Sequence, residues 1–557
     1  MGDSKARDEN VSLSTVGWVV IVAISVPYLI LAMHTPIVVN NIALHDDALY
    51  INHALSVLNG EWFGPYDQLT LAKGQGYTLY LVLGYVSGLP ITLMHALLYM
   101  LAVLCVILAV ARLTKITWLP VLLFALLLWH PAALLLRIVR DSIYVSQVLL
   151  ICGSLFFLMI ACLNDRFRPL LAMGAGFLFG WFWLTREEGI WLVPGLALLF
   201  LGTAWLQHRR RGSIGVLIRA LIVFMVAFVS VNVAYVSINK MQYGKFVGVD
   251  FKDANFEAAL AALQSVRAGE PVPFVPVPKS VRSKVYAESP SFAELKQFMD
   301  DGVSPGSAWG EFGCSVYPST CGDIAGGWFV WALRDAVATK GYYRSPSAAS
   351  TYYERLAREI HGACDAGRLT CRPSLVPYMP QLTSGQLYAI PGSLLHAIEM
   401  LTFSENPPGL DAPASNTNEK IDALLGRPLR TGQAATVGDR FDLSRATSKR
   451  MVWIYSVLLP LVGGIGMAAY LCHLVLAITG RVRISMSFVI VSSLWVMLAA
   501  RVAVLVLVDI SSFPAINRVY LMPAYPLFCL ASLLSTFDLM VSVAAKRAHG
   551  TRDPRIR

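Results

Sequence analysis

Long apolar runs constrain this chain more than any other feature of its sequence. As helices they can cross the hydrocarbon layer of a membrane, which is about 30 Å thick and takes roughly 20 residues. Charged residues make up only 14% of the chain, against roughly 25% in a soluble domain. The sequence therefore predicts an all-α polytopic membrane protein with about ten transmembrane helices, at 16–39, 91–111, 117–136, 142–163, 169–185, 189–206, 215–238, 451–477, 485–508 and 519–542.

The apolar run Tyr77–Leu89 is short for a span and ends in Gly88-Leu89-Pro90. It predicts a re-entrant or juxtamembrane helix. With ten spans, the Lys and Arg residues of alternate short loops fall on one side, which the positive-inside rule assigns to the cytoplasm. Both termini are expected there, in a plan that fits a bacterial inner membrane. The residues that set this orientation are Arg112, Lys115, Arg166, Arg168, Arg209, Arg210, Arg211, Arg481 and Arg483, with Lys546, Arg547, Arg552, Arg555 and Arg557 in the C-terminal tail.

The segment 239–450 differs from the rest of the chain because it is polar and rich in Pro and Gly. It is long enough for a folded domain, and we expect it to be an inserted, mainly α domain on the extracytoplasmic side. It would divide the chain into an N-terminal transmembrane module (1–238), this domain (239–450), and C-terminal transmembrane helices with a basic cytoplasmic tail (451–557).

Four of the nine cysteines lie in this segment as two closely spaced pairs, Cys314 with Cys321 and Cys364 with Cys371. In an exported domain, such pairs favour disulfides, whose connectivity the sequence leaves open. The alternative is a four-cysteine zinc site, although zinc ligands are usually only two to four residues apart.

Charged residues on the predicted outer side are the candidates for chemistry, because short outer loops are usually poor in Lys and Arg. Ionisable groups at membrane depth are costly and often mark a substrate path. A cavity lined by such cations suits an anionic headgroup such as a lipid phosphate. The cations concerned are Lys73, Arg137, Arg140, Arg186, Arg501 and Arg518, and the acids beside them are Asp141, Glu187 and Glu188.

The first outer loop is the richest in candidates. It contains the pair Asp46-Asp47, directly before a run with helical spacing of leucines, and one of these carboxylates could simply cap that helix. The loop ends in Lys73-Gly74-Gln75-Gly76, where the glycines permit a tight turn that aims Lys73 at the cavity. His45, next to the pair, is interpreted as a polar interface residue.

The order and sidedness of these elements resemble the GT-C glycosyltransferases, in particular the branch with protein O-mannosyltransferases and the lipid A aminoarabinose transferase. The resemblance covers about the first 240 residues and, more weakly, the last hundred. It departs from the family where glycines replace the prolines that usually follow the lysine, and where the second acidic residue is Asp. The elements that carry the resemblance are the Asp46-Asp47 pair, the Lys73-Gly74 turn, Arg140-Asp141, and the late element Arg518, Tyr520, Pro523 and Pro526.

This resemblance implies transfer of a sugar from a polyprenyl-phosphate donor to a lipid, glycan or protein acceptor of the cell envelope. Asp46 or Asp47 would be the general base, with Asp141, Glu187 and Glu188 as further candidates. The leaving phosphate would be stabilised by cations, and Glu187, Glu188 and Tyr520 would contact substrate. No cofactor is expected, although a divalent cation between the carboxylates stays possible. The basic side chains that would stabilise the leaving phosphate are those of Lys73, Arg140, Arg186, Arg501 and Arg518.

Other functions remain open at this point. A transporter or flippase would carry charges deep in the bundle and often two related halves, which the sequence does not show. A scaffold would use 239–450 as a binding domain, and a ligase could move a whole glycan from a lipid pyrophosphate. No nucleic-acid motif is present, and no nucleic-acid partner is expected.

Overall fold

The computed structural model describes residues 13–550, apart from 36, 38, 40–42, 115, 132–136, 302–304, 373–381, 404–417 and 427–437. Over these residues the chain is helical, and one isolated β-bridge joins Val266 to Cys371. The predicted all-α fold is therefore confirmed. The end of the span predicted at 117–136 and the side chains of the basic tail, from residue 545 on, lie outside what is described.

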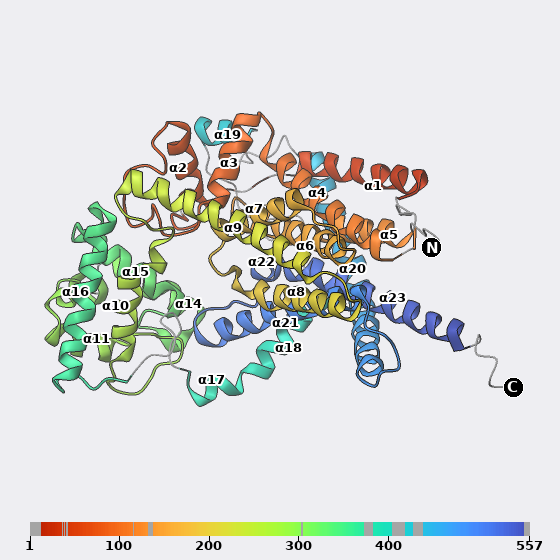
Figure 1. Ribbon diagram of the computed structural model, residues 1–557. Helices are drawn as coiled ribbons and strands as arrows, with labels where there is room; N and C mark the ends of the chain where they lie inside the picture. The colour runs from red at the N-terminus through yellow and green to blue at the C-terminus, as the bar shows by residue number, and fades with distance from the viewer. Residues whose placement is uncertain are drawn as a thin grey trace.

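Eight described helices are long and apolar enough to cross a membrane, and they form one bundle (Figure 1). Two further apolar helices, α5 (Leu119–Leu128) and α7 (Pro169–Thr185), are shorter. Helix α5 ends ahead of Pro131, which cannot continue a helix. The predicted ten spans would need both short helices to cross as well. The eight long helices are α1 (Thr15–His34), α4 (Ile91–Leu113), α6 (Asp141–Leu163), α8 (Val193–Arg209) preceded by η2 (Gly189–Leu192), α9 (Ile214–Tyr243), α20 (Gly438–Ile478), α21 (Met486–Ser511) and α23 (Ala524–Gly550).

The bundle has a buried centre and an exposed apolar surface. Helix α6 is central, because 83% of its most apolar stretch is buried, and it packs on α4 and α7. The corresponding figures are 28% for α9 and 22% for α20. Lipid tails are as apolar as leucine, so exposed apolar side chains on these two helices can face lipid at the periphery of a membrane bundle without cost.

The two ends of the bundle differ. Helix α1 begins and α23 ends at one end, while α9 leads into helices α10–α16 at the other (Figure 1). We call this second end the insert end. Helix α9 has 30 residues, or about 45 Å at about 1.5 Å per residue, and so extends beyond the hydrocarbon layer. Its last turns are fixed by two hydrogen bonds, from Trp62 Nε1 to Asn239 Oδ1 (3.0 Å) and from the Tyr243 hydroxyl to the Gly64 carbonyl (3.0 Å).

Three short helices gather at the insert end around one small core. Helix α3 (Gly76–Ser87) has 12 residues and packs on α2 (Asp47–Leu58) and α19 (Glu419–Leu425). At this length α3 cannot cross the bilayer, as expected for the run at 77–89. The left-handed Gly88 (φ 68°) ends it before Pro90.

The helices that follow α9 have a hydrophobic core of their own. Helix α16 packs across α10 and contacts α11 and α12, and α15 completes the group. The four largest show the apolar periodicity of helices packed on one side. The elements are η3 (Asp250–Lys252), α10 (Ala254–Ser265), α11 (Lys279–Glu288), α12 (Pro290–Ala293), α13 (Lys296–Asp300), α14 (Pro305–Val316), η4 (Pro318–Thr320), α15 (Gly326–Thr339), η5 (Tyr342–Arg344) and α16 (Pro346–Asp365).

The cysteine pairs of this group lie at disulfide distance. Cys314 bonds Cys321, with Cα atoms 4.4 Å apart, and Cys364 bonds Cys371, with Cα atoms 5.7 Å apart. The structure thus joins each residue to its near neighbour in sequence and supports disulfides over the zinc alternative. The other five cysteines are free and lie in the apolar helices.

Two further helices of the 239–450 segment lie apart from this core. Helices α17 (Ser384–Tyr388) and α18 (Ile390–Thr402) pack against α21, and α18 also contacts α20 and α23. The buried side chains of Ala397, Met400 and Leu401 belong to the core of the apolar bundle. With α19, which packs on α2 and α3, the described residues of the segment therefore form three parts with different partners.

Candidate active site

The acidic pair of the first loop opens α2 at the insert end. Asp46 occupies the position before the first helical residue, yet its side chain forms no capping hydrogen bond. Its carboxylate instead accepts a hydrogen bond from Lys73 Nζ, which also donates to the His45 carbonyl. The side chain of Asp46 is 48% exposed, whereas that of Asp47 is fully buried. Of the two predicted bases, only Asp46 is thus accessible to a substrate.

Asp47 forms an ion pair with Arg137. Arg137 approaches it with two nitrogens, Nε at 2.8 Å and a terminal nitrogen at 2.6 Å from Oδ2. The same guanidinium lies 3.8 Å from Asp46. Such two-point contacts fix the geometry of both partners, so Arg137 and Asp47 hold the start of α2 in place.

The lysine turn is fixed by close backbone packing. The Gly74 N–H donates to the carboxylate of Glu187, and a Cβ at Gly74 would collide with the Leu184 carbonyl. A Cβ at Gly76 would collide with Thr185. The two predicted glycines therefore serve a close approach between the turn and the end of α7, which places Lys73 beside Asp46.

Two more ion pairs cross the site, and they differ from the pairing expected from adjacency. Arg140 binds Glu187 at 2.7 Å, and Asp141 is paired with Arg186 instead of its neighbour Arg140. Consecutive residues at a helix start point in different directions. Arg186 also holds Glu188 at 2.8 Å. These contacts bring the ends of α6 and α7 together.

Aromatic rings line the buried side of this network. Arg186 lies over Tyr144 at 5.3 Å and over Tyr520 at 5.1 Å from the ring centroids. Arg501, buried in α21, donates to the Tyr520 carbonyl at 2.6 Å. Arg518 is buried at the start of α22 (Arg518–Leu521). Tyr520, two residues later, thus connects this helix to the cluster through Arg501 and Arg186.

The charged network shifts the pKa of its carboxylates. Partial removal of Asp46 from water raises its pKa, but Lys73, Arg137 and Arg140 outweigh this and lower it to about 2. Glu188 follows the same pattern, with Arg186 outweighing burial, and its pKa also falls to about 2. Burial lowers the pKa of Lys73 against the opposing charge of Asp46. Both carboxylates are therefore ionised at neutral pH and are weak proton acceptors.

We expect the Asp46 ion pair to survive mild acid. Its folded pKa of about 2 lies below the ordinary value of 3.8, so its stabilising effect is present above about pH 4 and is lost as the pH falls towards 2. The difference in melting temperature between the wild type and Asp46→Asn should be constant from pH 7 to 5 and shrink below pH 4. A difference that already shrinks between pH 7 and 5 would contradict the lowered pKa. The exposed Glu354→Gln is the control.

Residues from the inserted helices complete the site, and sequence reasoning did not find them. The ring of Trp331, in α15, lies 4.6 Å from that of His45 and 5.4 Å from Lys73 Nζ. Asp335 Oδ2 accepts from Trp309 Nε1 at 3.1 Å and lies 3.8 Å from His45 Nε2. His45 is thus enclosed by two tryptophans and faces a carboxylate. In the sequence, the feature that could have indicated a role for His45 was its position next to Asp46.

Sequence reasoning also missed a cation at the start of the inserted segment. Lys252, in η3, lies over the ring of Trp183 at 5.1 Å and donates to the Glu187 carbonyl at 3.2 Å. Nearby, Arg334 of α15 donates to the Gln68 carbonyl and to Asp250 (3.2 Å). The first loop and the inserted helices are therefore joined by polar contacts around the lysine turn.

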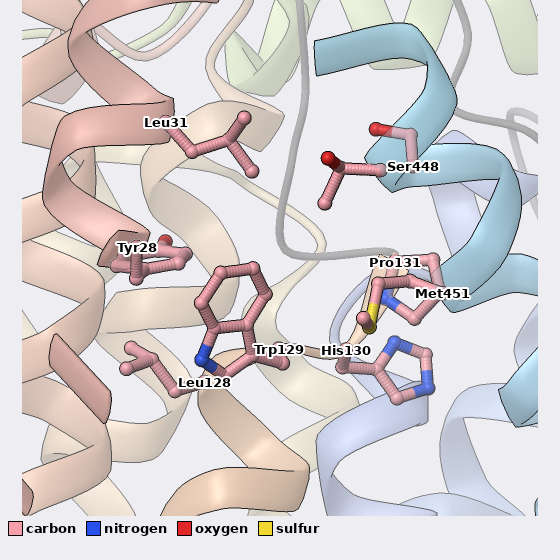
Figure 2. A pocket seen from close by; sticks show the side chains of 9 residues that line it. Tyr28, Leu31, Leu128, Trp129, His130, Pro131, Ser448 and Met451 are labelled. Carbon is pink, nitrogen blue, oxygen red and sulfur yellow. The ribbon is translucent and has the colours of Figure 1, made fainter. Parts of the chain in front are cut away.

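A small pocket lies beside the bundle, between α1, the end of α5 and α20 (Figure 2). Its volume is 10 Å³, room for about one water molecule. His130 and Trp129 border it together with Tyr28 and Met451. It is too small for a sugar or a lipid chain.

No metal site accompanies the cluster in the part of the chain that is described, where no three His, Cys, Asp or Glu side chains are placed to hold an ion. The oxygens that could bind a divalent cation are engaged: Asp46 by Lys73, Asp47 by Arg137 and Asp141 by Arg186.

Comparisons with protein-family models, curated proteins and solved structures found no match to this chain. The resemblance to the GT-C enzymes therefore rests on the residues described above.

Proposed function

We propose that this protein is a membrane glycosyltransferase that moves a sugar from a polyprenyl-phosphate donor to an acceptor on the extracytoplasmic face. The observation that carries the proposal is convergence: the predicted charges come from five separate segments and meet at one end of the apolar bundle. Lys73, Arg137, Arg140 and Arg186 are paired there with five carboxylates, and Arg501 lies beside them on the Tyr520 carbonyl. Lysine and arginine side chains gathered in this way suit a phosphate group bound at the membrane surface.

The position of the cluster supports a lipid-linked donor. It lies where α6 begins and α7 ends, beside α21, and where the helices of the inserted segment begin. A polyprenyl chain would remain among the apolar helices while its phosphate reaches Lys73. Orientation follows the positive-inside rule, which places the insert end outside the cytoplasm, and the two disulfides fit an oxidising compartment there.

The reaction needs a base and a stabilised leaving group. The acceptor hydroxyl attacks the anomeric carbon and loses its proton to the base. The bond from that carbon to the phosphate oxygen breaks, and the lipid phosphate leaves with both electrons. Lys73, with Arg140 behind it, stabilises the added negative charge. The cations are already fixed by carboxylates, so they need little reorganisation during the step.

His45 fits the role of base better than Asp46. A general base works best when its pKa is near the working pH, and the pKa of Asp46 is about 2. Lys73 Nζ donates to the backbone carbonyl of His45, and Asp335 faces the Nε2 of its imidazole. A base oriented by a carboxylate is a recurrent arrangement in acyl and group transfer. Asp46 then positions Lys73 and balances its charge.

The bound lipid is the first thing to identify. We expect native mass spectrometry of the full-length protein in detergent to show a polyprenyl-phosphate sugar on the wild type. Lys73→Ala should lose most of it, because the ammonium that binds the phosphate is gone. Lys245→Ala, which removes a lysine paired with Asp253 away from the cluster, is the matched control and should retain the lipid. Only bulk phospholipid in all three proteins would contradict the proposal and favour a transporter or scaffold.

A further inference from the structure

Helix α18 belongs to the inserted segment but is fastened to a spanning helix. The Ser393 hydroxyl is 2.7 Å from Asp509 Oδ2, and Gln386 Nε2 donates to the Ile510 carbonyl at 2.8 Å. Asp509 and Ile510 form the last turn of α21 at the insert end. Helix α18 therefore lies against the bundle where α21 leaves the apolar layer.

The surface of α18 has three stripes. One, with Ser393, Ala397, Met400 and Leu401, is buried against the bundle. The second is apolar and uncovered by the described residues: Leu394 is 41% exposed, Leu395 66% and Ile398 48%. At 3.6 residues per turn, this stripe continues the buried one around the helix. The third stripe carries His396 and Glu399, which are exposed on the remaining side.

The helix α20, against which α18 packs, and the residues that flank α18 also expose apolar side chains. Helix α18 packs against α20 and α21, and α20 has exposed apolar side chains along its length, such as Leu461 (61%) and Ile465 (59%). The residues that flank α18 are apolar and exposed as well: Leu387 (49%), Tyr388 (86%) and Phe403 (52%). A helix with an apolar face on one side and a polar face on the other typically lies in the plane of the membrane interface.

We infer that α18 is immersed in the leaflet at the insert end, with Leu394, Leu395 and Ile398 among the acyl chains of the bilayer. His396 and Glu399 then face the headgroups, where a charged side chain is hydrated. The occupant of this surface is lipid, and the inserted segment thereby has two environments. Helices α10–α16 project into water, and α17–α18 anchor the segment to the membrane.

Collision quenching of spin labels tests this inference without an activity assay. The full-length protein is labelled at Leu395→Cys in a Cys472→Ser background, since Cys472 is the exposed cysteine among the free ones of the described residues. The labelled protein is reconstituted in phospholipid vesicles. We expect the label to collide several-fold more often with oxygen, which concentrates in lipid, than with a water-soluble nickel chelate. Ile465→Cys on α20 is the lipid-facing control, and Glu354→Cys on α16 is the aqueous control.

Each outcome decides the question. A label at Leu395 that behaves like the one at Ile465, with His396→Cys intermediate, supports immersion. Behaviour like Glu354 overturns it, because the face is then in water. A label shielded from both reagents also overturns it, because the face is then covered by another part of the chain or a second copy. Ile398→Cys repeats the test on the same stripe in case Leu395→Cys does not fold.

Discussion

Arg186→Met is expected to destabilise the protein by about 3–5 kcal/mol, the usual cost of removing one partner from a buried ion pair. Arg186 is almost fully buried and holds both Asp141 and Glu188. Methionine fills most of its volume, but it leaves the buried carboxylate of Asp141 without the arginine that pairs with it. Unfolding in detergent by heat and by denaturant measures the loss.

Two further variants separate charge from packing. Arg186→Met combined with Asp141→Asn should recover part of the loss, because the stranded charge is gone. Arg358→Met removes an arginine that is 71% exposed and paired with Glu354, and should change stability by less than about 1 kcal/mol. A loss of less than about 1 kcal/mol for Arg186→Met itself would contradict the buried network.

His45→Gly is expected to reduce sugar transfer by roughly 10²–10⁴-fold, the usual contribution of a general base. Donor binding should persist, because Lys73 and Asp46 are untouched. The measurement is transfer from the donor lipid that mass spectrometry identifies, together with the amount of donor bound. Free imidazole should restore part of the rate, since a small base can enter the space left by the side chain.

The controls for this variant address position and chemistry separately. Asp335→Asn should slow transfer less than His45→Gly and should not respond to imidazole, because it acts through His45. His361→Gly, at an exposed site on α16, should leave transfer unchanged. If wild type transfers sugar and His45→Gly does so at the same rate, His45 is not the base, while the transferase proposal stands.

The membrane-spanning helices could be predicted because the thickness of the bilayer fixes the length of an apolar helix that crosses it. The apolar runs at 91–111 and 142–163 match α4 and α6 within a few residues. The run at 117–136 yields the ten-residue α5, because length and hydropathy do not show where a helix stops. The start of α1 and the end of α23 at one end of the bundle agree with the alternation of the basic loops.

The site was predictable as a set of charges but not as a set of pairs. Unusual cations in outer loops pointed to Lys73, Arg140 and Arg186. The partner of each cation depends on which helix ends meet, and sequence adjacency suggested Arg140 with Asp141 where the structure has Arg186. The roles of Trp331 and Asp335 could not be predicted from the sequence, because their approach to His45 depends on how the whole inserted segment folds.

The length of α9 has a mechanical consequence. It is one uninterrupted helix from the far end of the bundle to the first inserted residues, and its last turns are bonded to the loop that follows α2. Helices tilt to match the thickness of the bilayer around them. A rigid helix that tilts moves its end sideways, so a change in bilayer thickness shifts the end of α9 together with the loop that is bonded to it.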